Sequence, residues 1–305
     1  MNKAHYIEQV RLLLSCLPAL QNQDVFALKG GTAINFFIQD LPRLSVDIDL
    51  TYIKENTRNQ AIKEIQEGLR DLGKKITSYD SSYQIKELLT ADGLLKKIIV
   101  KSKRAQIKIE PNFIMRCSLL PTILMSLKKE VESAFKYSVN SIPVLNEAEL
   151  YAGKICAALS RQHPRDFFDV KKLFEAQGLT KEIRQAFVVY LVCSPRPISE
   201  LLRPNQINLK NTYETEFVNM TDEPVSLEEL MFVRDKLIKT VNQDLTGNEK
   251  EFLLSLKNGT PNYTLLPFNN LASLPALQWK LANIQKMAKQ KHQDRLEKLK
   301  AVLEI

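Results

Sequence analysis

Residues 28–50 read LKGGTAINFFIQDLPRLSVDIDL and end in an unusual arrangement of charge. In SVDIDL, Asp47 and Asp49 alternate with apolar residues, a pattern that predicts a β-strand. Residues two apart in a strand point to the same face, so the two carboxylates repel each other. A divalent cation would offset this repulsion, whereas an edge strand facing solvent would use the same charges to prevent aggregation. This stretch alone supports both interpretations equally.

A pair of glycines precedes the aspartates. Gly30, Gly31 and Thr32 lie between a predicted strand at residues 25–30 and a predicted helix at residues 32–38. Glycines at such a turn let the backbone approach a phosphate, and the N-terminus of the following helix supplies unpaired N–H groups. A purely structural turn would have the same sequence, and for a glycine pair in isolation it is the better interpretation.

A third carboxylate is predicted on a later strand. In AQIKIEPNF, Ile107 and Ile109 point to one face, and Lys108 and Glu110 point to the other. Glu110 on a strand beside the aspartates would complete a site for in-line phosphoryl transfer with two metal ions. A solvated strand glutamate is the alternative.

The segment NEAELYAGKICAALSRQHPRDFFDVKKLF, residues 146–174, predicts a charged helical region. Asn146 is a typical N-cap, with Glu149 at the capping-box position. Lys154 and Arg161 are two helical turns apart and share a face. Lys154 lies on a helix rich in Ala, Ile and Leu, which is unusual for a random surface lysine, and it could neutralise triphosphate charge.

A second helix is predicted to begin at Pro164. It carries Arg165, Asp166 and Asp169. Arg165 and Asp169 are four residues apart and could pair with each other, which explains both without any function.

The remaining pattern predicts a small mixed sheet followed by helices. A first helix is expected at residues 3–17, and another at 57–72 that ends at Gly73. Hairpins are expected at DSSY and ADG, between strands at residues 75–79, 84–89, 94–101 and 106–113. From residue 146 onward helical periodicity dominates, so a domain boundary is predicted near residue 140.

Composition is that of an ordinary globular protein. The 305 residues are 44% hydrophobic and 26% charged, with a net charge of +8 that suits an anionic partner such as nucleic acid or nucleotide. Four scattered cysteines and three scattered histidines have no metal-ligand spacing, so zinc is not expected. No signal peptide or bilayer-spanning stretch is recognised, and a soluble, cytoplasmic protein is expected.

These motifs together resemble a known family. LKGGTAINFF, R-x-S-x-DIDL, IKIE and ELYAGKICAALSR…PRDFFDVKKL resemble the nucleotidyltransferase toxins of the AbiEii/AbiGii type, which include the MenT toxins. The later segments EFVNM and LPALQWKLANIQKM also look like that family, so the resemblance covers most of the chain. The spacing between Gly31 and Asp47, fifteen residues, is longer than in most of the wider DNA polymerase β-like superfamily but suits this subgroup.

The resemblance implies an α+β fold: a nucleotidyltransferase-like mixed sheet with flanking helices in residues 1–140, and a mainly helical domain in residues 141–305 that contributes Lys154 and RDFFD to the active-site cleft. It implies that Mg²⁺ or Mn²⁺ is bound by Asp47, Asp49 and Glu110. Lys154, Asp166 and Asp169 complete the implied catalytic set. The implied nucleotide-binding residues are Gly30, Gly31, Thr32, Arg43, Ser45, Lys154, Arg161 and Arg165.

By the same resemblance, the reaction is transfer of a nucleoside monophosphate from an NTP to RNA, with the 3′ end of tRNA as the expected acceptor. A cognate antitoxin protein is the implied partner, within a bacterial toxin–antitoxin or abortive-infection system. The basic QKMAKQKHQDRLEKLK stretch could contact RNA, although a solvated terminal helix explains it better. Three alternatives remain open: transfer to a small molecule or protein hydroxyl, a non-catalytic binding module, and a hydrolytic metal site.

Overall fold

The computed structural model describes residues 3–305, which form two compact units. The first contains the residues up to Leu150 together with Thr215–Pro224, and the second contains Tyr151–Glu214 together with Val225–Ile305. The chain leaves the first unit close to the boundary predicted near residue 140. It then returns to the first unit at Thr215–Pro224. The predicted division at one boundary had placed this segment in the helical domain.

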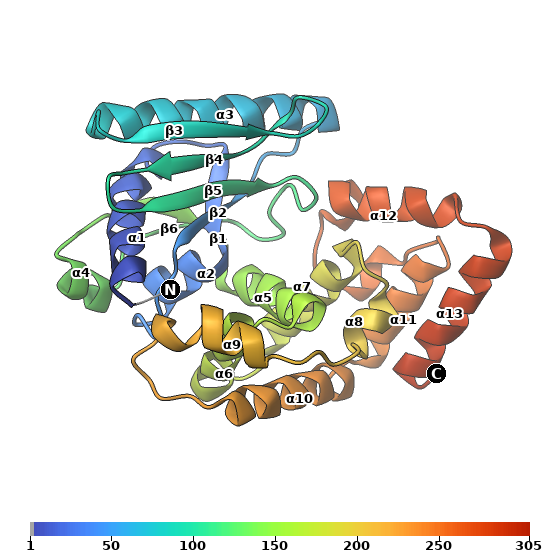
Figure 1. Cartoon of the computed structure of the whole chain (residues 1–305). Coiled ribbons are helices and arrows are strands. Elements are labelled where there is room, and N and C mark those ends of the chain that lie inside the picture. The colour runs from blue at the N-terminus through green and yellow to red at the C-terminus, as the bar shows by residue number, and fades with distance from the viewer. Residues whose placement is uncertain (1–2) are drawn as a thin grey trace. The chain divides into compact units, whose positions relative to one another are not determined.

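A seven-stranded mixed sheet forms the centre of the first unit (Figure 1). Its strand order is β3-β4-β5-β2-β1-β7-β6. The β2–β5 and β1–β7 pairs are parallel, and the other neighbours are antiparallel. The strands are β1 (Phe26–Lys29), β2 (Asp47–Tyr52), β3 (Gln84–Leu89), β4 (Leu95–Lys101), β5 (Gln106–Asn112), β6 (Ile123–Met125) and β7 (Ile142–Val144).

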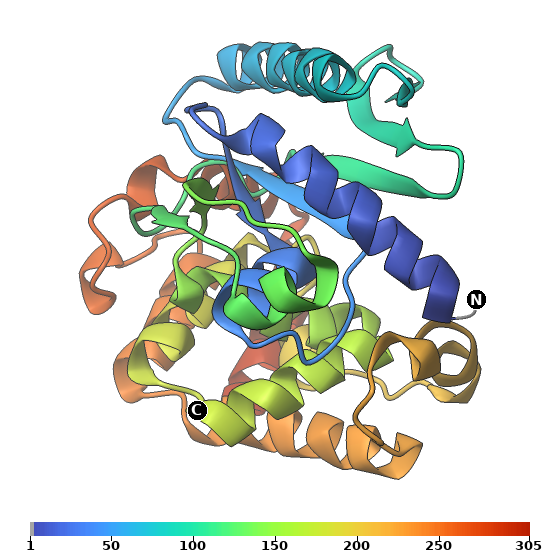
Figure 2. The ribbon, with the colours of Figure 1, turned by 90° about the vertical axis from the view of Figure 1, so that its left-hand side faces the viewer.

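Helices cover the apolar face of this sheet. Helix α3 packs against β3 and β4, and α1 packs against β5; Figure 2 shows α1 along its length. Gly68 of α3 lets the helix approach β1, because a Cβ atom there would lie 2.7 Å from the Phe26 ring. The helical elements of this unit are α1 (Lys3–Cys16), η1 (Leu17–Leu20), α2 (Gly30–Ala33), η2 (Ile34–Ile38), α3 (Arg58–Tyr79), α4 (Lys129–Phe135) and η3 (Val218–Met220).

Helix α3 corrects one prediction. It continues through Gly73 to Tyr79, so the strand predicted at residues 75–79 and the hairpin at DSSY are wrong. Gly73 is buried, and a Cβ atom there would lie 3.3 Å from a methyl of Ile85. Glycine is therefore a close-packing position inside the helix rather than its end. The second hairpin is confirmed, with Gly93 at φ +79° in the turn between β3 and β4.

The second unit is built of helices, as predicted for the C-terminal half. Helix α5 begins in the first unit and continues into the second. Helix α6 packs against α10, α7 against α11 and α12, and α13 against α8 and α11. The bounds are α5 (Glu147–Arg161), α6 (Pro164–Ala176), α7 (Lys181–Cys193), α8 (Ile198–Leu202), α9 (Lys210–Glu216), α10 (Leu227–Gln243), α11 (Gly247–Lys257), η4 (Tyr263–Leu265), η5 (Leu271–Ser273), α12 (Pro275–Gln285) and α13 (Lys289–Leu303). The α+β prediction is confirmed.

The start of α5 is fixed to a preceding loop. Asn146 Oδ1 accepts a hydrogen bond from the Ala148 backbone at 3.0 Å, in agreement with its predicted N-terminal position. The Glu149 carboxylate, predicted to close a capping box, accepts hydrogen bonds of 2.9 Å from the backbone N–H groups of Leu119 and Leu120. Within residues 3–305, no helix is both long enough and apolar enough to cross a bilayer.

Candidate active site

The aspartate pair lies on β2 with the predicted alternation. Asp47 and Asp49 are partly exposed, whereas Ile48 and Leu50 are buried. Strand β5 lies beside β2 in a parallel register that pairs Asp49 with Glu110. Because paired residues on neighbouring strands point to the same face of a sheet, the three carboxylates share the face that β2 does not use for the core.

Gly30 brings the backbone turn up to the second aspartate. Its φ of +73° lies in the region that glycine adopts without steric cost. A Cβ atom at Gly30 would lie only 2.4 Å from Asp49 Oδ2. The antiparallel register pairs Lys29 with Asp49, so the turn starts directly beside this carboxylate. Glycine is therefore required both for the turn and for the close approach.

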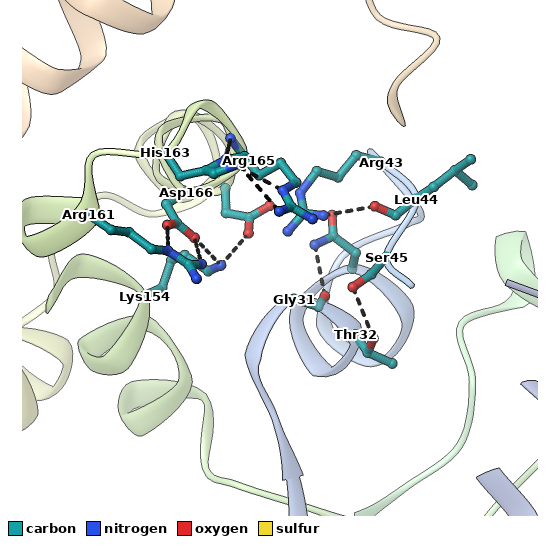
Figure 3. A network of polar contacts seen from close by, with 12 residues as sticks. Gly31, Thr32, Arg43, Leu44, Ser45, Lys154, Arg161, His163, Arg165 and Asp166 are labelled. Carbon is teal, nitrogen blue, oxygen red and sulfur yellow. Dashed lines mark hydrogen bonds and ion pairs between the residues drawn. The ribbon is translucent and has the colours of Figure 1, made fainter. Parts of the chain in front are cut away.

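The next two residues join this turn to the chain that leads into β2 (Figure 3). A Cβ atom at Gly31 would lie 2.8 Å from Arg43 Nη2 and 3.0 Å from Ser45 Oγ. The Thr32 hydroxyl donates towards the Asp47 carbonyl oxygen at 2.6 Å and lies 3.0 Å from Ser45 Oγ. Thr32 and Ser45 are buried, so their hydroxyls hold the turn against the strand. The turn, Arg43 and Ser45 thus form one polar network.

A distant segment of the chain fixes the loop that carries Arg43. The Leu44 backbone N–H donates to the Met220 carbonyl at 2.7 Å, and Thr221 Oγ1 donates to the Pro42 carbonyl at 2.9 Å. Arg43 itself is buried and donates to the Leu44 carbonyl at 2.8 Å. The segment around Met220 is part of EFVNM, which the sequence placed in the helical domain. In the structure it supports the candidate active site.

The carboxylates have the chemistry of a magnesium site. Asp47 and Asp49 offer the hard oxygen ligands that Mg²⁺ prefers. Glu110 Oε2 lies 3.0 Å from Lys97 Nζ, so this carboxylate already has a cationic partner. In the described part of the chain, no three acidic, His or Cys side chains come together as a metal cage. The donor set therefore fits Mg²⁺ held by two aspartates with substrate oxygens, and Glu110 as a metal ligand stays a prediction.

A second polar cluster lies in the helical unit and is centred on Lys154 of α5. Lys154 Nζ lies 2.8 Å from Asp166 Oδ1 and 2.8 Å from Asp169 Oδ2, both on α6. All three side chains are almost completely buried. Asp166 and Asp169 therefore hold the ammonium group of Lys154, and with Arg161 we call these four residues the Lys154 cluster.

Arg161 completes this cluster from the end of α5. Its Nε and Nη2 atoms lie 2.5 and 2.8 Å from the two Asp166 carboxylate oxygens, a bidentate arrangement visible in Figure 3. Burial alone would raise the pKa of Asp166, but Lys154 and Arg161 outweigh it and hold this pKa far below its usual range. Asp166 therefore stays charged. Asp169, for which the residue spacing suggested Arg165 as a partner, forms an ion pair with Lys154 of α5.

Arg165 lies beside a residue that the sequence reading did not use. The His163 side chain caps α6 by accepting a hydrogen bond from the Arg165 backbone N–H, with Nδ1 at 3.1 Å. The Arg165 guanidinium lies against the same imidazole, with Nη2 3.3 Å from Nε2. The position of His163 just before Pro164 was a signal for this cap, because proline commonly occupies the first helical position.

Three further residues near the candidate site could not be predicted from the sequence, for different reasons. Lys97 precedes Ile98 on β4, next to the strand that carries Glu110, and only the register of the two strands brings its charge to that carboxylate. Met220 and Thr221 reach the Arg43 loop through long-range contacts that leave no local pattern in the sequence.

The cysteines do not suit a nucleophilic role. Cys16, Cys117, Cys156 and Cys193 are free thiols, as predicted. Burial raises the pKa of Cys117 to about 11 and those of Cys16 and Cys193 to about 12, so these thiols stay protonated at neutral pH.

Comparison with known proteins agrees with this arrangement. A family model described as "Nucleotidyl transferase AbiEii toxin, Type IV TA system" matches residues 11–283. Among solved structures, MenT4, a nucleotidyltransferase toxin from Mycobacterium tuberculosis H37Rv, is similar, with a TM-score of 0.61 and 15% identity over 93% of this chain and 95% of that one. No curated protein matches. At this identity the structural likeness shows the fold alone, whereas the family match spans most of the sequence. The chain therefore belongs to the AbiEii family of nucleotidyltransferase toxins of type IV toxin–antitoxin systems.

Proposed function

We propose that this protein transfers a nucleoside monophosphate from an NTP to the 3′-terminal hydroxyl of an RNA, with tRNA as the acceptor. The observation that carries the proposal is the strand register that puts Asp47, Asp49 and Glu110 on one face, with the Gly30 turn against Asp49. Carboxylates on one face beside a glycine turn repel each other, and a divalent cation that also binds a triphosphate offsets this repulsion. Membership of the AbiEii family supports the same reaction class.

Asp47 and Asp49 would hold Mg²⁺, and Mn²⁺ has the same preference for hard oxygen ligands. When bound, such an ion neutralises charge on the phosphates and favours in-line displacement. Glu110 is the third carboxylate of this face, and its ion pair with Lys97 keeps it oriented. We assign Glu110 to the acceptor side of the reaction.

The reaction that fits these groups is a single displacement at phosphorus. The acceptor hydroxyl oxygen forms a bond to the α-phosphorus, the bond from that phosphorus to the bridging oxygen breaks, and pyrophosphate leaves. The hydroxyl proton passes to a carboxylate oxygen of Glu110. Backbone N–H groups at the Gly30-Gly31 turn bind the phosphates, and Arg43 and Ser45 keep that turn in shape through the network beside Gly31.

The proposal gives Lys154 the task of neutralising triphosphate charge. Two of its three ammonium hydrogens point to Asp166 and Asp169, which leaves one for a phosphate oxygen. Asp166 and Asp169 are then positioning residues, since they act through Lys154 rather than on the substrate. Arg161 and Arg165 are the additional cations that the proposal assigns to nucleotide binding.

The acceptor and partner are further parts of the proposal. A net charge of +8 favours an RNA acceptor over a neutral small molecule. A type IV system pairs its toxin with an antitoxin, so a cognate antitoxin protein is the expected partner in the cell.

Incubation of the protein with each α-labelled NTP and Mg²⁺, in the presence of total RNA, total protein or a small-molecule extract, tests the proposal. Label is expected in RNA and at tRNA 3′ ends. Label in protein or small molecules alone would contradict the RNA acceptor. If no fraction is labelled under any condition, the enzymatic assignment itself fails.

Asp47→Asn is expected to lower transfer by roughly 100-fold or more and to relieve growth inhibition, because one charge that the cation requires is removed. Glu87→Gln is the matched control, since Glu87 is an exposed carboxylate on edge strand β3 of the same sheet. It is expected to transfer at the parental rate. Equal activity of the Asp47 and Glu87 variants would refute the site.

A further inference from the structure

The helical unit contains a pocket that the proposed reaction does not use. It lies between the end of α11, the helices α12 and α13, and the loop that follows α7, with a cavity volume of about 100 Å³. This volume suits a group the size of a phosphate rather than a whole nucleotide, so the rest of a larger ligand would lie over the opening of the pocket. Its lining includes Lys257, Lys280, Arg295 and Trp279, and we call it the Trp279 pocket.

Three cations line this pocket, and no lining residue is acidic. Lys257, at the end of α11, is only 8% exposed. In residues 3–305 its ammonium group forms no ion pair with a carboxylate, and the same is true of Arg295. The Lys257 backbone carbonyl lies 2.7 Å from His292 Nε2, which fixes the end of α11 to α13. A buried cation without an anionic partner is costly unless a ligand supplies the charge.

Lys280 is only partly satisfied within the protein. Its Nζ donates to the carbonyl oxygens of Ser194 at 2.6 Å and Arg196 at 3.1 Å, so it caps the C-terminal end of α7. An ammonium group has three hydrogens, and in the described chain the third has no partner. Burial, with repulsion from Lys257 and Arg295, lowers the pKa of Lys280 to about 8. Burial and Arg295 also lower the pKa of Lys257.

The position of Lys280 in the pocket can be explained by its role in capping α7. This role does not explain why Lys257 and Arg295 lie there too. Mutual repulsion among three positive groups destabilises the empty pocket. A bound anion would reverse this effect for all three at once. The charge pattern therefore points to an anionic ligand.

The exposed side chain of Trp279 indicates that the ligand also carries an aromatic base. Trp279 is 50% exposed although it is large and apolar. It lines the same pocket as the cations, together with Pro195 and Pro197. An exposed indole beside phosphate-binding cations is the combination that proteins use to stack a base of single-stranded nucleic acid.

We propose that the Trp279 pocket binds one nucleotide unit of a single-stranded RNA, with the phosphate held by Lys257, Lys280 and Arg295 and the base stacked on Trp279. This inference rests on the proposed function in that the RNA is the acceptor strand. A free nucleotide shares the same chemistry, so the experiment compares the two sources.

Trp279 is the single tryptophan of the chain, so its fluorescence reports on this pocket directly. The titration uses the full-length Asp47→Asn variant, which removes turnover, and adds a short oligoadenylate, AMP or inorganic phosphate. The oligoadenylate is expected to quench Trp279 at concentrations at least tenfold below those of AMP. Phosphate is expected to compete without quenching. Absence of quenching by the oligoadenylate would overturn the proposal, and equal affinity for AMP would overturn the assignment to a strand.

Arg295→Gln and Lys257→Gln are expected to weaken oligoadenylate binding about tenfold each, while Lys298→Gln leaves it unchanged. Lys298 is the matched control, because it lies on the same helix as Arg295 and is exposed. With three cations neutralising phosphate charge, log K should fall with log salt with a slope of about −2. Unchanged binding in both pocket variants would overturn the site.

The two proposals fail separately. Quenching in the Asp47→Asn variant without any transfer to RNA by the parent protein supports the pocket and contradicts the proposed function. Transfer to RNA without quenching contradicts the pocket alone.

Discussion

The helical unit contains two groups of cations that differ in one respect. In the Lys154 cluster, two carboxylates meet two cations at 2.5 to 2.8 Å. In the Trp279 pocket, Lys280 donates to two carbonyl oxygens, and within residues 3–305 none of the three cations forms an ion pair with a carboxylate. In the first group, carboxylates balance the cations and fix the position of Lys154. In the second group, no carboxylate of the described chain balances the three cations. Variants that remove one charge at a time test this difference.

The largest effect is expected for Asp166→Asn. The change leaves Lys154 and Arg161 without their shared, fully buried anion and should cost about 3–5 kcal/mol of unfolding free energy. Urea denaturation at pH 7 measures this cost. Asp294→Asn, an exposed change on α13, is the control and should have no measurable effect. A loss of unfolding free energy below about 1 kcal/mol for Asp166→Asn would show that this carboxylate does not stabilise the fold by neutralising Lys154 and Arg161.

Acidic pH should abolish the difference in unfolding free energy between the parent protein and the Asp166→Asn variant. The folded pKa of Asp166 lies far below the unfolded value of 3.8, so its stabilisation is fully present above pH 4 and is lost as the pH falls towards the folded pKa. The stability gap between the parent protein and Asp166→Asn should therefore narrow below pH 4. A constant gap from pH 7 to pH 2.5 would contradict the pKa shift.

Alkaline pH should increase the stability of the protein through Lys280 of the Trp279 pocket. The folded pKa of Lys280, about 8, lies below its unfolded value of 10.5, so the charged form opposes folding below pH 8. As the pH rises from 8 towards 10.5, stability should increase by at most about 3 kcal/mol. Urea denaturation at pH 7.5 and pH 10 measures this change, with Lys280→Met as the comparison. A fall in stability that is equal in both proteins would contradict the shift.

A smaller effect is expected for Arg161→Gln. Its side chain is 59% exposed, but it donates two bonds to a fully buried carboxylate that Lys154 continues to neutralise. The expected loss is about 1–2 kcal/mol, from charge-assisted hydrogen bonds rather than from an unpaired charge. Combined with Asp166→Asn, the double variant should lose less than the sum of the two single losses, because both changes remove the same contact. Simple additivity would contradict the bidentate pair.

The smallest effect on stability is expected for Lys257→Met. Removing a buried cation that has no carboxylate partner should leave stability within about 1 kcal/mol of the parent or raise it. Lys298→Met on the exposed face of α13 is the matched control. A loss comparable to that of Asp166→Asn would mean that Lys257 has a structural partner, and the contrast between the two groups would disappear.

Much of the candidate active site could be predicted because its signals are local. The alternation in SVDIDL puts Asp47 and Asp49 on the same face of their strand, the alternation in AQIKIEPNF puts Glu110 opposite the apolar face of its own strand, and the glycine pair marks the turn before them. Periodicity of two is a property of the strand itself, so it is visible without the neighbours. The helical character of the second half was visible for the same reason.

The parts that were missed depend on what packs against a residue. Gly73 looked like a helix end, but it lies inside α3 because a neighbouring strand requires a small residue there. Asp169 was expected to pair along its own helix, and the structure gives it an ion pair with Lys154 of another helix. Neither the strand register that joins Lys97 to Glu110 nor the bond from Leu44 to Met220 has a counterpart in local sequence. Tertiary contacts decide such cases.

The bond between Leu44 and Met220 has a consequence for the synthesis of this toxin. The loop that carries Arg43 and Ser45 is secured by residues that the ribosome adds much later, after almost the entire first unit and part of the helical unit have been made. Closing such a long loop is entropically costly, so early chains should not hold it in its final shape. A nascent chain with complete aspartates and glycines would thus still lack the finished network around them. The network around the candidate active site is therefore completed only after translation has passed Thr221.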